Sequence, residues 1–291
     1  MPDEQPLAPG LYLVATPIGN LEDISLRALR ILRSADRIAC EDTRQTIKLL
    51  NHFDIKTPTV SYHIHNERER AEELVSALKG GARIAVVSDA GMPGIADPGE
   101  EIVRVAAAAG IPVFPVPGAN AVLSALTASG MPSERFAFHG FLPSKPGERR
   151  TALETLLAEM RSTAAPATQI FYETPHRIVE ALADVTAVFG PAHAVTVARE
   201  LTKLHEEFLR GPVSQVHATL ATRENVRGEM VLLLSGVLAA EDLAKVSVTE
   251  AVRLLIKSGL EEKDALKQVA RERSIGKSDA YREWQRGKNK R

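Results

Sequence analysis

Three loops rich in glycine, proline and aspartate follow short apolar runs that are typical of β-strands. Glycines let backbone amides and carbonyls approach a ligand closely, and prolines hold the loop shape, so little ordering entropy is lost on binding. Turn formation alone would explain one such loop. Three of them favour a ligand site, because ligands of open α/β sheets bind at the carboxyl ends of the strands. The loops are residues 16–25, 88–99 and 116–121.

Two further clusters place charged side chains after predicted strands in the second half of the chain. They are YETPHR at residues 172–177 and ARELTK at residues 198–203. Carboxylates and amines in such loops can transfer protons, whereas guanidinium groups stay charged and can pair bidentately with phosphates. For the first cluster, helix capping by Thr174 and Pro175 is an equally good explanation. For the second cluster we favour a functional role.

Several standard signatures are absent from the sequence or incomplete in it. No GxGxxG follows the first predicted strand, which argues against an ordinary dinucleotide-binding fold. A GKS sequence at residues 276–278 resembles the end of a P-loop, but Arg271 stands where the earlier glycine is required. His63 and His65 have neither accompanying cysteines nor an HExxH pattern, so we expect no metal site.

The elements that must position the first three loops alternate between apolar runs and helical patterns. This alternation predicts a mainly parallel sheet with helices on its faces. Ser25 and Asn66 are predicted helix caps, and Glu69 stands at capping-box spacing from Asn66. The predicted strands are residues 11–16, 37–40, 59–62, 83–89 and 111–116, and the predicted helices are residues 25–33, 42–52, 66–79 and 99–109.

A second α/β unit follows a predicted helix over residues 119–130 and a hinge at Met131. A third segment opens with a capping-box pattern at Ser247 and Glu250 and continues as two or three short helices, broken at Gly259 and Gly276. We therefore predict α/β domains at residues 11–128 and 129–238, the second with a mixed sheet, and a helical segment at 247–291. In the second domain the predicted strands are residues 135–139, 168–173, 194–199 and 229–235, and the predicted helices are residues 148–161, 175–189 and 214–222.

Length and composition predict a globular chain in a reducing compartment. The 291 residues are 44% hydrophobic and 25% charged, which fits roughly two domains. The single cysteine, Cys40, excludes an internal disulfide framework and fits the cytoplasm. The first ten residues lack the apolar core of a signal peptide, and no apolar run approaches the ~20 residues that span a bilayer. We expect a cytoplasmic protein.

The formal net charge of −1 conceals an uneven distribution along the chain. Residues 246–291 hold twelve Lys or Arg against seven Asp or Glu, whereas the first 245 residues hold 24 against 30. Such asymmetry is typical of a segment that binds a polyanion. A solvated helical face with a frayed tail would explain the charge equally well.

Together these segments resemble the bacterial ribosomal RNA small subunit methyltransferase I family, which is part of the tetrapyrrole methylase superfamily. The match covers most of residues 11–235 in order, and the C-terminal segment matches more loosely. Tetrapyrrole-methylating relatives carry a GxGxGD-type first loop where this chain has TPIGN, which argues against a porphyrinoid substrate. Met92 and Arg227 are smaller departures that remove no charged or turn-forming group. The resemblance rests on LYLVATPIGNLEDISLRAL, CEDTR, HNE, SDAGMPGIADPG, PGANA, YETPHR, ARELTK and RGEMVLLL.

The resemblance implies a two-domain α/β fold of the tetrapyrrole-methylase type, that of class III methyltransferases, with S-adenosylmethionine in the cleft between the domains. It also implies a homodimer that methylates the ribose 2′-hydroxyl of a decoding-centre cytidine, cytidine 1402, of 16S rRNA in the 30S subunit. A porphyrinoid methylase and a non-catalytic RNA-binding assembly factor are the alternatives. The cofactor contacts that the resemblance implies are Pro17, Asp89, Gly91, Ile95, Ala119, Asn120, Tyr172, Leu201, Gly228 and Met230.

Methyl transfer from a sulfonium is an in-line displacement, so positioning of the acceptor oxygen is the main catalytic lever. A ribose hydroxyl is a poor nucleophile while protonated, and a general base could add about 10²–10⁴-fold. The sequence leaves the catalytic group open among Glu200, Lys203, Glu173, Asp42 and Arg44.

Four cations are expected to contact RNA. Arg177 and Arg199 are predicted phosphate clamps, and the basic C-terminal segment is expected to dock RNA through phosphates. Tyr281 and Trp284 could stack on bases, although packing between helices explains Trp284 at least as well. The predicted RNA contacts are Arg177, Arg199, Lys277 and Arg282.

Overall fold

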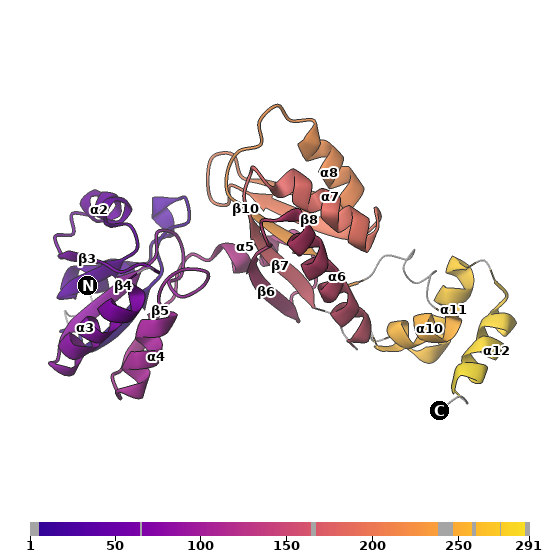
Figure 1. Cartoon of the computed structure of the whole chain (residues 1–291), viewed down its shortest axis with the longest axis horizontal. Coiled ribbons are helices and arrows are strands. Elements are labelled where there is room, and N and C mark those ends of the chain that lie inside the picture. The colour runs from indigo at the N-terminus through magenta and orange to yellow at the C-terminus, as the bar shows by residue number, and fades with distance from the viewer. Residues whose placement is uncertain are drawn as a thin grey trace. The chain divides into compact units, whose positions relative to one another are not determined.

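A computed structural model describes residues 6–64, 66–163, 167–237, 247–257, 260–273 and 275–288 (Figure 1). The chain divides into two compact units, Met1–Ser124 and Ala125–Arg291. Within the described ranges, no helix has the length and apolar character needed to cross a membrane. His65 and Gly259, which entered the expectations for a histidine pair and a helix break, lie outside the described residues.

The first unit contains one fully parallel sheet in the order β3-β2-β4-β1-β5, as the alternating pattern predicts. Its strands are β1 (Gly10–Val14), β2 (Arg37–Cys40), β3 (Thr59–Ser61), β4 (Arg83–Val87) and β5 (Val113–Val116). Its connecting elements are η1 (Leu21–Asp23), α1 (Leu26–Ser34), α2 (Thr43–His52), α3 (Glu67–Lys79) and α4 (Glu100–Ala108), and α5 (Ala121–Ser129) begins here.

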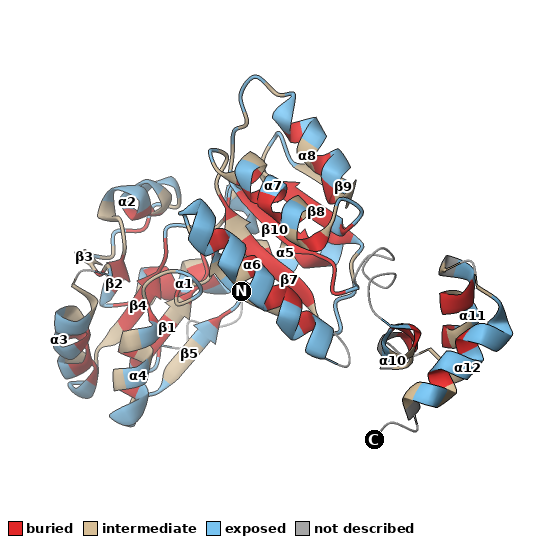
Figure 2. Cartoon of the chain, turned by 45° about the vertical axis from the view of Figure 1, so that its right-hand side comes forward, coloured by how far each residue is buried: buried red, intermediate tan, exposed pale blue. Residues whose placement is uncertain are grey.

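Both faces of this sheet are covered by helices, as parallel strands require. On one face, Ile31 and Leu32 of α1 pack with Val14 and Ile38 of the strands. On the other face, side chains of α3 and α4 pack with Leu11, Ala39, Ile84 and Val86. Figure 2 shows the resulting buried residues along the strands and the exposed outer faces of the helices.

The helix caps of the first unit follow the sequence only in part. Ser25 caps α1 as predicted, because its hydroxyl accepts from the Ala28 amide at 3.1 Å. The capping box at Asn66 is wrong: its Oδ1 accepts from the His63 amide at 2.8 Å and closes the turn before α3 instead.

A side chain from another helix caps α4. The Glu67 carboxylate accepts from the Gly99 amide at 3.0 Å and from the Tyr62 hydroxyl at 2.9 Å. The Tyr62 hydroxyl in turn accepts from the Ile102 amide at 3.2 Å. The end of the loop 88–99 is therefore anchored to the start of α3.

The second unit contains a mixed five-stranded sheet in the order β6-β7-β10-β8-β9, so the prediction of a mixed sheet is confirmed. Only β6 and β7 are parallel neighbours. The strands are β6 (Phe136–Phe141), β7 (Thr168–Glu173), β8 (Ala194–Arg199), β9 (Glu207–Pro212) and β10 (Met230–Leu234). The helices that follow α5 here are α6 (Pro146–Ser162), α7 (Ile178–Phe189) and α8 (Val213–Ala221).

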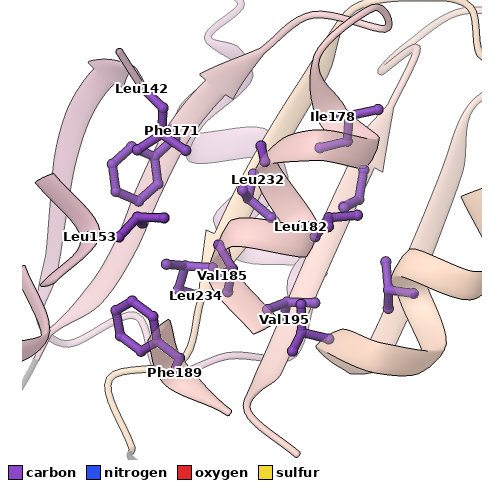
Figure 3. Close-up of a cluster of buried hydrophobic side chains, with 14 of the residues drawn as sticks. Leu142, Leu153, Phe171, Ile178, Leu182, Val185, Phe189, Val195, Leu232 and Leu234 are labelled. Carbon is purple, nitrogen blue, oxygen red and sulfur yellow. The ribbon is translucent and has the colours of Figure 1, made fainter. Parts of the chain in front are cut away.

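One face of this sheet forms an apolar core with α6, α7 and α8. Figure 3 shows Ile178, Leu182 and Val185 of α7 directed at the strand residues Leu232 and Leu234. A buried ion pair also joins the helices, because Arg149 of α6 donates to Asp184 of α7 at 2.7 Å.

Two features of this unit differ from the sequence expectations. Strand β9 is not predicted, because in EFLRGP only Leu209 packs against the apolar core and the strand lies at the sheet edge. Helix α7 begins at Ile178 without a side-chain cap, so capping by the Thr174 side chain is wrong. The Thr174 carbonyl accepts from the Arg177 and Ile178 amides instead.

The C-terminal helices α10 (Val248–Lys257), α11 (Glu262–Glu272) and α12 (Lys277–Lys288) share a separate apolar cluster. Ser247 caps α10, because its hydroxyl accepts from the Glu250 amide at 3.2 Å. Trp284 is 3% exposed inside this cluster, so base stacking by Trp284 is wrong and helix packing is confirmed. Tyr281 is 51% exposed and remains available to a partner.

Gly99→Ala should destabilise the first unit by about 1–3 kcal/mol, because residue 99 has a φ of +148°. A Cβ there would also lie 2.9 Å from the Gly94 amide nitrogen. The matched control is Gly147→Ala in α6, where a Cβ meets nothing within 4 Å, and helix propensity should stabilise by roughly 0.5–1 kcal/mol. Scanning calorimetry of both variants checks the opposite signs. Equal shifts would contradict the assigned backbone at Gly99.

Candidate functional site

The three glycine-rich loops of the first unit lie side by side. They follow β4, β1 and β5, which are adjacent parallel strands. The Thr16 amide donates to the Gly91 carbonyl at 2.9 Å, and the Gly91 amide donates to the Thr16 carbonyl at 3.1 Å. The Ala15 amide donates to the Val116 carbonyl at 3.2 Å. The prediction that these loops share one sheet edge is confirmed.

Acidic side chains give this edge a negative potential. Burial, with the Glu41 and Asp89 charges, raises the pKa of Asp97 to about 6. Burial and then the Asp89 charge raise the pKa of Glu41 as well. A cation placed among these carboxylates would be stabilised. Sequence reasoning named Asp89 but missed Glu41 and Asp97, although Glu41 directly follows β2 and Asp97 lies in the second loop.

The described residues contain no group of three or more His, Cys, Asp or Glu side chains arranged to hold a metal ion. His63 is among the described residues, whereas His65 lies outside them.

The other predicted cofactor contacts of the first unit differ in exposure, and one of them caps a helix. Ile95, in the second loop, is 40% exposed, and Pro17 and Ala119 are half-buried. The Asn120 side chain accepts from the Leu123 amide at 2.9 Å. Helix capping therefore uses the side-chain oxygen of Asn120, and its backbone is the part that the loop can offer to a ligand.

Asp42 and Arg44 form an ion pair at the start of α2. The Asp42 carboxylate caps α2 by accepting from the Arg44 amide at 2.8 Å, and it pairs with the Arg44 guanidinium at 3.0 Å. The Arg44 hydrogen bonds hold the pKa of Asp42 below its usual value. The Asp42 amide donates to Asp89 at 3.1 Å, which joins this pair to the acidic edge.

The second unit gathers its candidates at the sheet edge where β7 and β8 end and β10 begins. Lys203 Nζ lies 2.9 Å from Glu200 Oε1 and 2.9 Å from Glu229 Oε2. The Glu229 amide also donates to Glu200 at 3.2 Å. The structure therefore joins Glu200 and Lys203, as the ARELTK cluster suggested, and adds Glu229.

Opposite charges fix the ionisation of this cluster. The hydrogen bond from Lys203 lowers the pKa of Glu200 in spite of partial burial. Burial lowers the pKa of Lys203, but Glu200 and Glu229 together raise it above its usual value. At neutral pH Glu200 is a carboxylate and Lys203 an ammonium, so of these two candidates only Glu200 can accept a proton in this state.

The backbone around Glu200 is strained. Glu200 has a φ of +53° and Thr202 a φ of +66°, and a β-branched residue rarely adopts such a value. Of the four described non-glycine residues with positive φ, Glu200, Thr202 and Ala96 lie in candidate loops. Such strain is concentrated at ligand and catalytic sites. Gly228 is required beside it, because a Cβ at that position would overlap the Glu200 side chain.

Glu173 and Arg177 hold the 172–177 loop together. The Glu173 side chain is 0% exposed, accepts from the Thr174 amide at 2.8 Å and lies 3.3 Å from the Arg177 guanidinium. Burial raises the pKa of Glu173. Arg177 also donates to the Leu142 and Pro143 carbonyls. Both side chains are thus engaged within the protein.

Arg199 is likewise ion-paired, with its Nε 3.0 Å from Glu207. Arg223 donates to both oxygens of Glu207, at 2.8 and 2.6 Å. The predicted phosphate clamps Arg177 and Arg199 therefore already have carboxylate partners. By contrast, Lys277 and Arg282 are exposed on α12, where Arg282 lies 3.6 Å from Asp279.

The apolar cofactor candidates of the second unit differ in access. Leu201 and Met230 are buried, so the strand end offers a ligand mainly their backbone. Tyr172 is half-buried and its ring contacts Phe138 and Phe141 at centroid distances of 4.8 and 5.6 Å. Sequence reasoning missed these two phenylalanines, for which the apolar FAFHGF run was the only signal.

Glu207→Gln should lower the thermal midpoint at pH 7, because it removes a carboxylate held by two guanidinium groups. Hydrogen bonds from Arg223 and then Arg199 lower the pKa of Glu207 from 4.5 to about 2. This stabilisation is present above pH 4.5 and is lost as the pH falls toward 2. Thermal melts should show the wild-type and Gln proteins converging across that interval. A constant gap would contradict the ion-pair network.

Comparison with known proteins matches both α/β units of the chain. The family profile described as Tetrapyrrole (Corrin/Porphyrin) Methylases matches residues 10–217. Diphthine synthase shares the fold at a TM-score of 0.58 and 17% identity, covering 79% of this chain and 91% of that one. Uroporphyrin-III C-methyl transferase from Thermus thermophilus, complexed with S-adenyl homocysteine, has a TM-score of 0.51 and 18% identity, covering 78% and 97%. The expected fold class is confirmed.

Curated relatives are much more similar in sequence. A protein of Halalkalibacterium halodurans named ribosomal RNA small subunit methyltransferase I is 50% identical over 277 residues, which is 93% of each chain. Proteins of the same name from Pseudomonas aeruginosa and Bacillus subtilis are 48% and 43% identical, covering 84% and 93% of this chain and 85% and 92% of theirs. The chain therefore belongs to the tetrapyrrole methylase family and, within it, to the ribosomal RNA small subunit methyltransferase I group.

Proposed function

We propose that this methyltransferase moves the methyl group of S-adenosylmethionine to the ribose 2′-hydroxyl of a cytidine in 16S rRNA of the 30S subunit. We further propose that it acts in the cytoplasm as a homodimer. The observation that carries the rRNA substrate is the identity of 50% over 93% of both chains with a relative named for that activity. The Thermus thermophilus neighbour, complexed with S-adenyl homocysteine, supports the cofactor.

The first-unit loops fit S-adenosylmethionine in chemistry. The cofactor carries a sulfonium and an ammonium, and Glu41, Asp89 and Asp97 supply the negative potential that such cations need. Backbone groups of the adjacent loops, including those of Gly91 and Asn120, can bind its polar atoms. When bound, the cofactor supplies an electrophilic methyl group.

In this proposal Glu200 orients the acceptor hydroxyl and takes its proton as the O–CH₃ bond forms and the S–CH₃ bond breaks. Lys203 cannot accept a proton while it is paired with Glu200 and Glu229. Glu173 is fully buried, and Asp42 caps α2. Because its low pKa makes Glu200 a weak base, positioning contributes more than proton abstraction.

The test offers 30S subunits and a porphyrinoid side by side with tritiated S-adenosylmethionine. We expect label in 16S rRNA, at the ribose of a cytidine, and none in the porphyrinoid. Label in the porphyrinoid alone would favour a tetrapyrrole methylase. Cofactor binding by calorimetry without transfer to either acceptor would favour a non-catalytic assembly factor.

Glu200→Gln and Lys203→Ala should each slow single-turnover methyl transfer by about 10²-fold or more, while the S-adenosylmethionine Kd changes little. The reason is that each removes one charge from the pair that fixes the hydroxyl. Glu224→Gln, in a nearby exposed loop, is the control. Transfer rates equal to wild type at saturating 30S would reject the assigned roles.

The basic helices should dock RNA through phosphates. The double variant Lys277→Gln, Arg282→Gln should raise the KM for 30S and weaken its dependence on salt, without changing the S-adenosylmethionine Kd. The charge-retaining variant Lys277→Arg, Arg282→Lys is the matched control and should behave like wild type. Identical salt dependence in all three proteins would refute the docking role.

A further inference from the structure

Helix α1 carries three arginines on its exposed surface. Arg27, Arg30 and Arg33 are spaced by three residues and all are exposed, whereas Ala28, Ile31 and Leu32 are buried. Residues three apart are neighbours on one helix face. Along the axis the three positions span about 9 Å at 1.5 Å per residue. We call this surface the α1 arginine stripe.

The stripe differs from most other arginines of the first unit in its partners; among the described residues, Arg68 of α3 also pairs with no carboxylate, but glutamates flank it in the sequence. Arg37, Arg44, Arg70, Arg83 and Arg104 each pair with a carboxylate. Within the described part of the chain, Arg27 and Arg30 pair with none, and Arg33 donates to the Phe53 carbonyl at 2.9 Å. Two guanidinium groups are thus left to solvent.

This arrangement costs the helix stability. Helix α1 contains no acidic residue, and Arg27 lies in its first turn, next to the positive end of the helix dipole. A cation there is unfavourable by about 0.3–1 kcal/mol, and like charges on neighbouring turns cost about 0.2–0.5 kcal/mol per pair. The body of the chain is otherwise acidic, so local folding does not account for the stripe.

The stripe begins a short distance along the chain from the candidate site. Helix α1 follows the loop 16–25, which leaves the carboxyl end of β1. Its first turn, with Arg27, is therefore close in sequence to Pro17 and to the edge where the three glycine-rich loops meet. An anion bound along α1 would extend away from that edge.

We infer that the α1 arginine stripe binds backbone phosphates of the rRNA substrate, as a contact surface separate from the C-terminal helices. Unpaired guanidinium groups bind phosphate bidentately without first giving up a carboxylate. Duplex RNA, like duplex DNA, presents closely spaced backbone charges, with about one charge per 1.7 Å in DNA, so the stripe spans more than one phosphate. This inference rests on the proposed rRNA substrate.

The test compares wild type with Arg27→Gln, Arg30→Gln in equilibrium filter binding to 30S subunits at a series of KCl concentrations. Each lost phosphate contact lowers the slope of log K against log [salt] by about 0.7–0.9. We expect a shallower slope by about 1.4–1.8 for the double variant, and a raised KM for 30S with unchanged kcat and S-adenosylmethionine Kd.

Two variants control for charge and position. Arg27→Lys, Arg30→Lys keeps both charges and should retain the wild-type slope. Arg68→Gln removes an exposed arginine from α3, where Glu67, Glu69 and Glu72 are close to it in the sequence, and should also leave the slope unchanged. An unaltered slope in the Gln double variant would overturn the inference, as would a matching change in Arg68→Gln or weaker cofactor binding. Because binding to 30S is measured without methyl transfer, failure of the proposed reaction would register separately.

Discussion

The reciprocal hydrogen bonds between Thr16 and Gly91 are the constraint on which the first half of the site depends. They form an isolated antiparallel bridge just beyond the ends of the parallel strands β1 and β4, and so fix two loops against each other. Glu67 and Tyr62 close the other end of the second loop at α4. A twelve-residue loop is thereby held at both ends, and within it burial, followed by the charges of Glu41 and Asp89, raises the pKa of Asp97.

In the second unit, ion pairs and a strained backbone hold the loop that carries Glu200 and Lys203. Lys203 is shared by two carboxylates, and the left-handed backbone at Glu200 and Thr202 directs their loop. Gly228 leaves space for the Glu200 side chain. The unfavourable backbone is tolerated because hydrogen bonds to Glu229 and Glu206 determine the loop from both sides.

Much of this arrangement could be predicted from the sequence, because it depends on local pattern. The spacing of apolar residues, together with glycine, proline and aspartate in the turns, predicted nearly every strand and the three loops of the first unit. Strand β9 escaped prediction because its only core residue is Leu209 and its pairing with β8 is a tertiary choice. The roles of Glu67 and Trp284 depend on partners distant in the chain, which a single sequence does not reveal, and Asn66 closes a local turn that the capping-box pattern does not distinguish from a helix cap.

The apolar cluster of α10, α11 and α12 consists of residues from these helices and their connections alone. A change in that cluster therefore alters the helices without disturbing the packing of either sheet. The C-terminal segment can accordingly diverge, or be exchanged between relatives, at a pace of its own.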